Sequence, residues 1–560
     1  MRPEATPELI EHARTWAAHD PDESDRATIL ALADAAQDAD EAAAAELVSR
    51  FSGPLMFGTA GLRAAVGAGE SRMSRAVVIR ATAGLVAYLT KELGQAPTVV
   101  LGCDARHGSS QFLRDAAQVV SAAGGTALVL PEKLPTPVTA FAVRRLGADA
   151  GVMITASHNP REDNGYKVYL GGRAARGAAE GVQIVPPADR GIAECIAAAP
   201  FADEVPRNEE RVQHVESALW EEYVDRAASL AVSDPAPIRI VLTPMHGVGG
   251  ATAVEVLRRA GFTHVHVVPE QAEPDPDFPT VAFPNPEEPG ALDLALGLAQ
   301  EVEADVVIAL DPDADRCSVG TCGPDGWRQL TGDEIGALLG EQAAADSSRV
   351  GDTLANSIVS GRLLSRIAQA HGLQHQATLT GFKWIARTEG LRFGYEEAIG
   401  YCTDPMGVRD KDGVTAAVQV ASLVSALAKQ GRSISDALDD LARAHGLHAT
   451  AQLSFRVADT ALIADAMARL RATPPSALAG SEVKQVVDLA DGYEGLAPTD
   501  GVLFITADND RVIARPSGTE PKLKCYLEVV VPVSGEQVPR GEAAQRLELL
   551  KEDMRAAVGL

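Results

Sequence analysis

The chain alternates short apolar runs with longer helical segments in three successive blocks, and this rhythm constrains its fold more than any other feature. The first block holds three predicted strands and two predicted helices, at residues 98–101, 127–130 and 150–154 and at residues 111–123 and 137–146. Similar series begin at Ile238 and after Gly332. Alternation of this kind is typical of βαβ units, which build a parallel sheet covered by helices.

The two ends of the chain depart from this rhythm. Residues 1 to about 50 are acidic, contain an alanine-rich stretch and are predicted to be helical. From about residue 446, several predicted strands accompany one helix near 461–470, which indicates a smaller α+β domain. A chain of 560 residues exceeds what one core usually serves. We therefore expect four domains with cuts in the linkers near 200–210 and 324–326, namely residues 1–205, 206–324, 325–445 and 446–560.

The charge and the cysteine content argue against several classes of protein. A net charge of −27 disfavours binding to nucleic acid or to anionic membranes, because both depend on clustered Lys and Arg. No apolar stretch approaches the roughly 18 residues that a bilayer needs, and the first residues lack the apolar core of a signal peptide. The six scattered cysteines predict small buried side chains rather than disulfides. We expect a cytoplasmic enzyme with a local positive site for anionic ligands.

The densest chemistry lies in the segment 155–167, directly after the predicted strand 150–154. It brings the hydroxyl of Ser157, the imidazole of His158 and the ammonium of Lys167 into one predicted loop. Enzymes of the α/β class present reactive groups in this way, at the end of a buried strand. An ordinary turn is the alternative, because Ser, Asn, Pro and Gly populate turns for conformational reasons alone.

A second polar loop follows another apolar run, at residues 304–309, and carries Asp311, Asp313 and Asp315. Three carboxylates so close would repel one another unless a cation lay among them. An EF-hand loop would need Gly and Glu where the chain has Arg316 and Cys322. We therefore predict Mg²⁺ on the three aspartates, with a phosphate oxygen completing its shell and the loop curled to bring them together. A solvated acidic turn is the alternative.

Two further segments suit the binding of a phosphorylated sugar. Residues 514–522 combine the guanidinium of Arg515 with hydroxyls and a glycine, which suits a phosphate dianion. Residues 394–401 place the carboxylates of Glu396 and Glu397 beside glycines, which suits hydrogen bonding to sugar hydroxyls. A glutamate pair alone is more often merely solvated.

In their order along the chain, these four loops resemble the phosphoserine, metal, sugar-binding and phosphate-binding loops of the α-D-phosphohexomutase superfamily, the phosphoglucomutases and phosphomannomutases. The resemblance is strongest to the phosphoglucomutase-2 and phosphopentomutase branch, because of residues 57–63, 380–385 and 410–413. It implies a fold of three similar mixed α/β domains and a C-terminal α+β lid domain around a central cleft.

The resemblance also implies a mechanism. Ser157 would carry a phosphoryl group and pass it to a sugar monophosphate, and the resulting sugar 1,6-bisphosphate would reorient and return its other phosphate. Mg²⁺ on Asp311, Asp313, Asp315 and the phosphoserine would neutralise charge. Lys167, Arg63 and His158 are all candidates for proton transfer, and the sequence does not choose among them.

For the substrate, the resemblance implies α-D-glucose 1-phosphate and glucose 6-phosphate, with a phosphomannomutase or a phosphopentomutase as alternatives. A metal-dependent sugar phosphatase and an inactive sugar-phosphate-binding protein are further alternatives. Many family members have serine where this chain has Ala398, which leaves the preferred sugar open. The substrate-binding residues are expected to be Arg316, Gly381, Phe382, Lys383, Glu396, Ala398, Arg515, Ser517, Gly518 and Thr519.

Overall fold

A computed structural model of the protein describes residues 5–323, 326–346, 348–457, 459–517 and 522–560. The chain forms two compact units. The first unit comprises the residues up to 320 and the segment 404–425, and the second comprises 321–403 and 426–560. The chain thus leaves the first unit, builds part of the second and returns before it completes the second.

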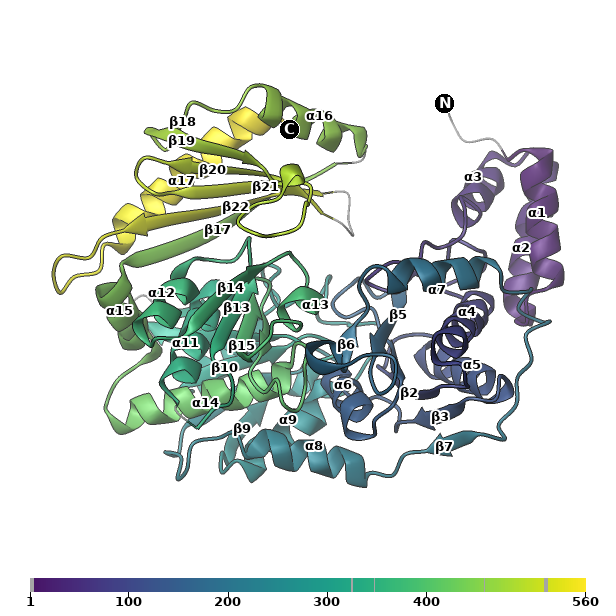
Figure 1. The fold of residues 1–560 in the computed structure, drawn as a ribbon, viewed down its shortest axis with the longest axis horizontal. Coiled ribbons are helices and arrows are strands. Elements are labelled where there is room, and N and C mark those ends of the chain that lie inside the picture. Colours follow the sequence, from purple (N-terminus) through teal and green to yellow (C-terminus); the bar gives the residue numbers. More distant parts are fainter. Residues whose placement is uncertain (1–4, 324–325, 347, 458, 518–521) are drawn as a thin grey trace. The chain divides into compact units, whose positions relative to one another are not determined.

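The first unit begins with three helices, which confirms the predicted helical extension: α1 (Pro7–Ala18), α2 (Glu23–Gln37) and α3 (Glu41–Arg50), at the purple end of the chain in Figure 1. Each starts where a polar side chain accepts a backbone N–H of the first turn, from Thr6, Asp22 and Asp40. The helices pack through buried apolar side chains such as Trp16 and Leu47.

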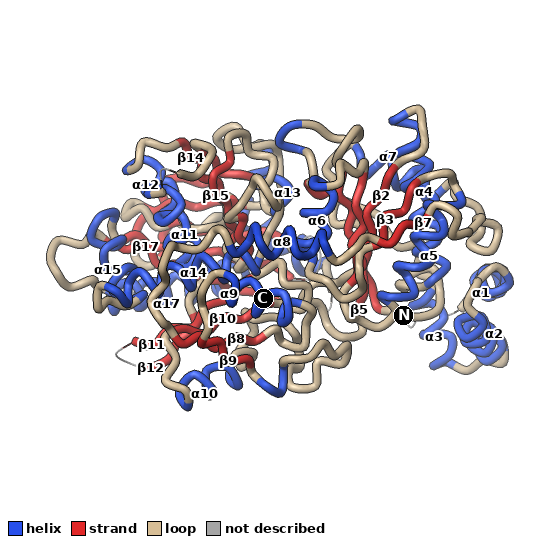
Figure 2. Tube along the Cα trace, turned by 90° about the horizontal axis from the view of Figure 1, so that it is seen from below, coloured by secondary structure: helices blue, strands red, loops and turns tan. Residues whose placement is uncertain are grey.

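The first sheet has the strand order β1-β5-β4-β2-β3-β7, and β6 pairs with β5. Strands β4, β2, β3 and β7 are parallel, as the alternation predicts, while β1, β5 and β6 run antiparallel to their neighbours. Helices α5 and α6 pack against β2 (Figure 2). The strands are β1 (Leu62–Ala65), β2 (Thr98–Cys103), β3 (Thr126–Val129), β4 (Ala150–Ile154), β5 (Asp163–Leu170), β6 (Val182–Gln183) and β7 (Val212–His214), and the helices are α4 (Arg75–Leu93), α5 (Ser109–Ala122), α6 (Thr136–Arg145) and α7 (Ala188–Ala197).

Strand β5 corrects the expectation that Ser157, His158 and Lys167 share one loop. The loop ends at Glu162, and Lys167 lies in the middle of β5, where it pairs with Met153 of β4. The sequence suggested a loop because β5 contains Asn164 and Lys167, which are polar. Both are buried here, since each finds a polar partner inside the fold.

The second sheet repeats the same plan. The strand order is β12-β11-β10-β8-β9. Strands β10, β8 and β9 are parallel, and β11 is antiparallel to β10 and leads the chain to the edge strand β12. The predicted strand before the aspartate loop is β10. The elements are α8 (Ala218–Ala228), β8 (Arg239–Thr243), α9 (Gly249–Arg259), β9 (His264–Val267), α10 (Asp293–Glu301), β10 (Val306–Leu310), β11 (Cys317–Gly323), β12 (Gly326–Gln329) and the returning helix α14 (Gly413–Lys429).

The second unit contains a third sheet, of order β14-β13-β15-β16, in which only β16 is antiparallel to its neighbour. The helix expected after Gly332 is α11, whose first turn is closed by reciprocal bonds between Thr331 and Glu334. The elements are α11 (Gly332–Ala345), β13 (Thr353–Ser357), α12 (Leu363–Ala370), β14 (Gln374–Thr378), α13 (Phe382–Ile385), β15 (Leu391–Glu396), β16 (Gly400–Cys402) and α15 (Ile434–His445).

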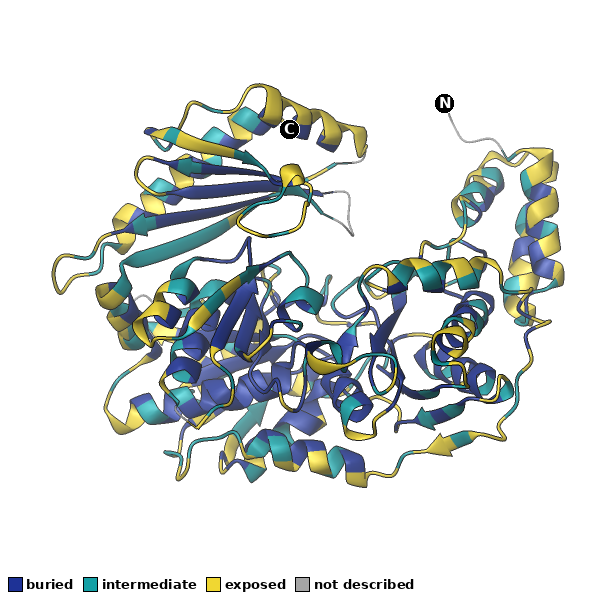
Figure 3. Cartoon of the chain, viewed as in Figure 1, coloured by how far each residue is buried: buried dark blue, intermediate teal, exposed yellow. Residues whose placement is uncertain are grey.

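The fourth sheet, β17-β22-β21-β20-β19-β18, is antiparallel throughout and buries one face under α16 and α17 (Figure 3). It confirms the predicted C-terminal α+β domain, so the fold consists of three mixed α/β domains and this smaller one. Its elements are β17 (Leu447–Arg456), α16 (Ala461–Ala472), β18 (Ala477–Leu478), β19 (Ser481–Asp488), β20 (Val502–Thr506), β21 (Arg511–Pro516), β22 (Lys522–Val531) and α17 (Arg540–Val558).

Two smaller expectations have different outcomes. Four of the six cysteines are buried, but Cys195 is half-buried and Cys322 is exposed at the end of β11, so the expectation that all are buried is wrong for these two. None of the helices within the described ranges is long and apolar enough to cross a membrane.

Candidate active site

Ser157 lies in a tight turn at the carboxyl end of β4, and its backbone adopts a left-handed conformation with φ of +51°. The Thr155 hydroxyl accepts the amide N–H of Ser157 at 2.9 Å, which starts the turn. The Ser157 hydroxyl is almost fully buried and donates to Oδ2 of Asp311 at 2.8 Å. The phosphoserine candidate and the aspartate loop therefore meet directly within the first unit.

The aspartate loop curls as predicted. Ala314 has a left-handed φ of +57°, and one carboxylate oxygen from each of Asp311, Asp313 and Asp315 lies within 4.8 Å of the other two. All three carboxylates are buried, and Thr136 fixes Asp313 by donating its backbone N–H and its hydroxyl at 2.9 and 2.7 Å. The loop thus presents three oxygen ligands at one point.

The three aspartates form direct ion pairs with three cationic side chains. Lys167 Nζ lies 2.8 Å from Asp313 and 3.0 Å from Asp315, Lys411 Nζ lies 3.3 Å from Asp315, and Arg316 Nε lies 3.7 Å from Asp315. Side chains of the chain itself therefore offset the repulsion that the sequence alone attributed to a metal. We call this set the charge cluster: Asp311, Asp313, Asp315, Lys167, Arg316 and Lys411.

The charge cluster still contains carboxylate oxygens that could bind a cation. Among the described residues, the Oδ1 atoms of Asp313 and Asp315 are buried and have no hydrogen-bond partner. Buried carboxylate oxygens without a partner are costly unless an ion or water satisfies them. Hard oxygen donors suit Mg²⁺, Mn²⁺ or Ca²⁺ rather than a softer metal. These residues therefore fit a divalent cation beside the Ser157 hydroxyl.

Electrostatics separates the three carboxyls. Burial, and then the negative charges of Asp313 and Asp315, raise the pKa of Asp311 well above its usual value. Burial also raises the pKa of Asp315, but Lys167, Lys411 and Arg316 outweigh it, so this pKa is lowered. Asp311 accepts the Ser157 hydroxyl, and its negative charge is the one that the cations of the charge cluster neutralise least.

The three proton-transfer candidates occupy different positions around Ser157. His158 is nearest, with Nδ1 at 3.1 Å from the Ser157 hydroxyl, and burial followed by the charge of Arg316 lowers its pKa well below the usual value. Lys167 is held by Asp313 and Asp315; burial lowers its pKa, but these two carboxylates raise it overall. Arg63, on β1, donates to Asn159 at 2.9 Å and so contacts the turn rather than the hydroxyl.

Lys411 was missed as a site residue by the sequence analysis. Its segment, residues 410–413, served only to identify the branch of the family. The segment is held in place because Asp412 accepts the Tyr223 hydroxyl at 2.9 Å and two backbone N–H groups that begin α14. The available signal was a lysine between two aspartates, but only the fold shows that Lys411 is buried and reaches Asp315, almost 100 positions earlier.

In the second unit, strand β15 ends at Glu396, Glu397 follows it directly, and both are buried. Glu397 is held inside the fold, since its Oε2 accepts the hydroxyls of Ser357 and Ser360 at 2.9 and 3.0 Å. The alternative of a merely solvated glutamate pair therefore does not apply here. Buried carboxylates at a strand end are the arrangement that sugar hydroxyls would need.

Arg515 lies near these glutamates. It is on β21, and the adjacent strand β22 carries Tyr526. Burial and then the charge of Glu397 raise the pKa of Tyr526, and Glu396 adds a smaller contribution. Tyr526 therefore lies within electrostatic range of both glutamates and of Arg515. The sequence identified Glu396 and Arg515 separately, and the structure brings them to one tyrosine within the second unit.

The other predicted substrate-binding residues are placed as follows. Gly381 has φ of +109° and precedes the short helix α13, which contains the buried Phe382 and the half-buried Lys383. Ala398 is half-buried in the turn between β15 and β16. The N–H of Ser517 donates to the carbonyl of Lys522 at 2.8 Å. Gly518 and Thr519 lie outside the described residues.

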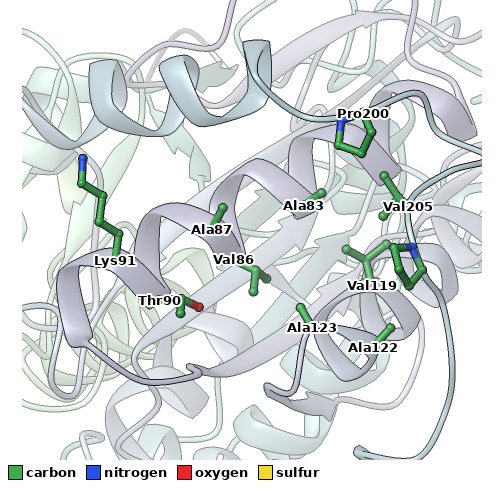
Figure 4. A pocket seen from close by; sticks show the side chains of 11 residues that line it. Ala83, Val86, Ala87, Thr90, Lys91, Val119, Ala122, Ala123, Pro200 and Val205 are labelled. Carbon is green, nitrogen blue, oxygen red and sulfur yellow. The ribbon is translucent and has the colours of Figure 1, made fainter.

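A separate apolar groove of about 480 Å³ lies between α4, α5 and the segment 200–206 (Figure 4). It is lined mainly by alanine, valine and proline side chains, with Thr90 and Lys91 at one end. None of the predicted site residues borders it. The chemistry of the site therefore does not depend on this groove.

Comparison with protein families gives four consecutive matches along the chain. They are described as phosphoglucomutase/phosphomannomutase, alpha/beta/alpha domains I, II and III, at residues 54–202, 221–322 and 331–445, and the C-terminal domain of the same family, at residues 455–540. The matched segments contain Ser157, the aspartate loop, Glu396 and Arg515, in that order.

Similar curated proteins act on different sugars by name. The chain is 44% identical to the "probable phosphomannomutase" of Haemophilus influenzae over 81% of this chain and 93% of that protein. It is 35% identical to the human phosphopentomutase over 87% of each. It is 31% identical to the phosphoglucomutase of Staphylococcus aureus over 86% of this chain and 91% of that protein.

Proposed function

The chain belongs to the phosphoglucomutase/phosphomannomutase family, and we propose that it interconverts α-D-glucose 1-phosphate and glucose 6-phosphate. The observation that carries the proposal is the 2.8 Å hydrogen bond from the Ser157 hydroxyl to Asp311, inside a buried cluster with open carboxylate oxygens. A hydroxyl fixed beside a cation site is suited to carry a phosphoryl group.

The proposed reaction consists of two opposite transfers. The phosphoryl group leaves the Ser157 oxygen and bonds to the free O6 of glucose 1-phosphate, and the proton of that hydroxyl passes to a base of the site. The product is glucose 1,6-bisphosphate, which also serves to phosphorylate the resting enzyme. After this intermediate turns around, its O1 phosphoryl group returns to Ser157 and a proton is delivered to O1.

Asp311, Asp313, Asp315 and the phosphorylated Ser157 would hold Mg²⁺, which supplies charge neutralisation at the phosphoryl group. Lys167 and Arg316 stay close to the transferred group through their pairs with the aspartates. His158, Lys167 and Arg63 all remain candidates for the proton transfer, and His158 is the one in contact with the serine oxygen.

The residues of the second unit would recognise the rest of the substrate. We propose that Glu396 accepts hydrogen bonds from sugar hydroxyls and that Arg515, with the loop 517–519, holds the phosphate that does not react. Arg515 and Glu396 share Tyr526 as a neighbour, which supports a common role. Gly381, Phe382, Lys383 and Ala398 would set the orientation of the sugar.

Two related proposals follow from the same reasoning. The substrates are charged esters that do not cross membranes unaided, which supports a cytoplasmic place of action on small phosphosugars rather than on nucleic acid or lipid. We also propose the domain boundaries 1–205, 206–324, 325–445 and 446–560. Each domain then holds most strands of one sheet, while β7 and β12 pair with strands of the domain before them.

The test is an activity comparison on the purified protein with Mg²⁺ and catalytic bisphosphate. Glucose 1-phosphate, mannose 1-phosphate and ribose 1-phosphate are supplied in turn, and the isomerised ester and inorganic phosphate are both measured. We expect the highest kcat/KM for glucose 1-phosphate. Preference for mannose or ribose would assign one of the alternative mutases, release of phosphate without isomerisation would assign a phosphatase, and binding without turnover would indicate an inactive protein.

A further inference from the structure

Arg106 makes an unusual set of hydrogen bonds to the turn that carries Ser157. Its Nη2 donates to the carbonyls of Ser157 and Asn159 at 2.7 and 2.6 Å, and its Nη1 donates to the carbonyls of Pro160 and Asp163 at 2.7 and 3.0 Å. One buried guanidinium thus gathers four backbone carbonyls around itself. No part of the mechanism above uses this residue.

The turn that Arg106 holds is strained. Ser157 has φ of +51°, a left-handed conformation that side chains other than glycine seldom adopt. Such a conformation persists only where the surrounding structure over-determines it. The Thr155 hydroxyl stabilises the beginning of the turn, and Arg106 bonds to its backbone carbonyls from Ser157 to Asp163.

Arg106 itself is fixed on its other sides. Asp104 accepts the backbone N–H of Arg106 at 2.9 Å and lies 3.5 Å from its Nε. The Ser109 hydroxyl donates to the same Asp104 oxygen at 2.7 Å. The ring of Phe278, from the loop after β9, lies 5.1 Å from the guanidinium carbon. Contacts outside the Ser157 turn therefore also fix the position of the guanidinium.

We propose that Arg106 is a positioning residue that keeps Ser157 in its left-handed conformation, so that the serine oxygen points at Asp311 and transfers its phosphoryl group to the sugar rather than to water. The inference rests on the proposed function and extends it to a residue that does not contact the substrate. If Ser157 relaxed to an ordinary φ, its side chain would turn away from the charge cluster.

The requirement is specific for arginine. A guanidinium presents donors on two terminal nitrogens in a planar fork, so each nitrogen can bridge two carbonyls. A lysine keeps the charge but concentrates its donors on one nitrogen, which cannot reach the same four oxygens. The variant Arg106→Lys therefore removes the clamp and keeps the charge.

Arg80 provides a matched control in the same unit. Its Nε donates to the carbonyl of Pro200 and its Nη2 to that of Ala199, both at 3.1 Å, and its guanidinium carbon lies 5.8 Å from the centre of the Trp16 ring. Arg80 thus makes the same kinds of contact without touching the Ser157 turn. The variant Arg80→Lys reports the general effect of losing such contacts.

Both variants are assayed with Mg²⁺ and glucose 1,6-bisphosphate. For Arg106→Lys we expect kcat to fall about 100-fold, because a displacement near 1 Å of a reacting group has that effect, with KM changed much less. The ratio of phosphoenzyme hydrolysis to phosphoryl transfer to the sugar should be higher in Arg106→Lys than in wild type. Arg80→Lys should keep the wild-type kcat and the wild-type ratio of hydrolysis to transfer. A kcat and a ratio of hydrolysis to transfer for Arg106→Lys equal to those of Arg80→Lys would overturn the proposal.

Hydrogen exchange separates this inference from the proposed function. The amides of residues 157–163 should exchange faster in Arg106→Lys than in wild type, and Arg80→Lys should leave them unchanged. This holds even if the wild type isomerises no sugar phosphate, a result that would refute the proposed function alone. If Arg106→Lys does not fold, Phe278→Leu, which removes the ring beside Arg106, should show the same changes to a smaller degree. Unchanged exchange and kcat in that variant would equally contradict the clamp.

Discussion

A methyl group added at Gly247 should displace the aspartate loop, because it would collide with the backbone of Pro312. Gly247 lies in the turn between β8 and α9, and a Cβ atom there would lie 2.4 Å from the Cα of Pro312 and 2.5 Å from its carbonyl oxygen. Ordinary carbon contacts are about 3.5 Å or longer. The loop must therefore move by about 1 Å, because both obstructing atoms are backbone and no side chain can rotate aside.

The displacement acts on Asp311 and Asp313, the residues on either side of Pro312. We expect Gly247→Ala to lower kcat by about 100-fold, as a 1 Å misplacement does, and to require more Mg²⁺ for half-maximal activity. Overpacking should also lower the free energy of unfolding by about 1–3 kcal/mol. Gly247 has no left-handed φ, so the alanine backbone itself adds no strain. Glucose 6-phosphate formation at varied Mg²⁺ and urea unfolding measure these effects.

Gly297→Ala is the control. Gly297 lies in α10 of the same domain, and a Cβ atom there would have no described atom within 4 Å. Alanine should stabilise this helix by about 0.5–1 kcal/mol and leave kcat unchanged. The reasoning is refuted if Gly247→Ala retains wild-type activity and Mg²⁺ dependence, or if Gly297→Ala loses as much activity as Gly247→Ala.

Three further predictions concern the nucleophile, the phosphate site and the N-terminal helices. Ser157→Ala should abolish isomerisation without lowering the urea midpoint, because the residue that carries the phosphoryl group is lost; undiminished turnover would sink the assignment. Arg515→Ala should raise KM roughly 10- to 100-fold, since a charged hydrogen bond contributes about 1.5–3 kcal/mol, and unchanged kinetics would remove it from the phosphate site. Burial, and then the charges of Asp20 and Asp22, raise the pKa of Asp25 to about 6. A carboxyl whose pKa is raised on folding destabilises the protein as pH rises from the unfolded value near 3.9 through 6. Asp25→Asn should therefore stabilise by about 1 kcal/mol at pH 7.5, after allowance for its partial exposure, and not at pH 4; equal unfolding curves at pH 7.5 would contradict this.

Strands β2, β3 and β4 and helices α5 and α6 could be predicted because their signals are local. Strand β4 is an apolar run that is buried at every residue, and the loop after it begins where polarity begins. Strand β5 could not be predicted in this way, since Lys167 is buried only because Asp313 and Asp315 neutralise it. Its strand therefore resembles a loop until the second sheet is known.

The same distinction applies to the site. The three aspartates at alternate positions predict an oxygen-ligand site and a curled loop by themselves, and the structure shows the curl at Ala314. Lys411 and Arg106 have no comparable local pattern, because each acts on residues far away in the chain. Their contribution follows from the topology, which brings the carboxyl ends of β2 and β4 to one edge of the first sheet and the start of α14 beside the aspartate loop.

The charge cluster explains how a chain with a net charge of −27 can handle a dianionic phosphoryl group. Its three carboxylates are matched by three cationic side chains, so the cluster is formally neutral while Ser157 carries only a hydroxyl. Phosphorylation adds a charge of about −1.5 to −2 in a buried place. One divalent cation on the open oxygens of Asp313 and Asp315 would restore neutrality. If Ser157 carries the phosphoryl group as proposed, the side chains would balance the site before phosphorylation, and the phosphoserine would add to its need for a cation.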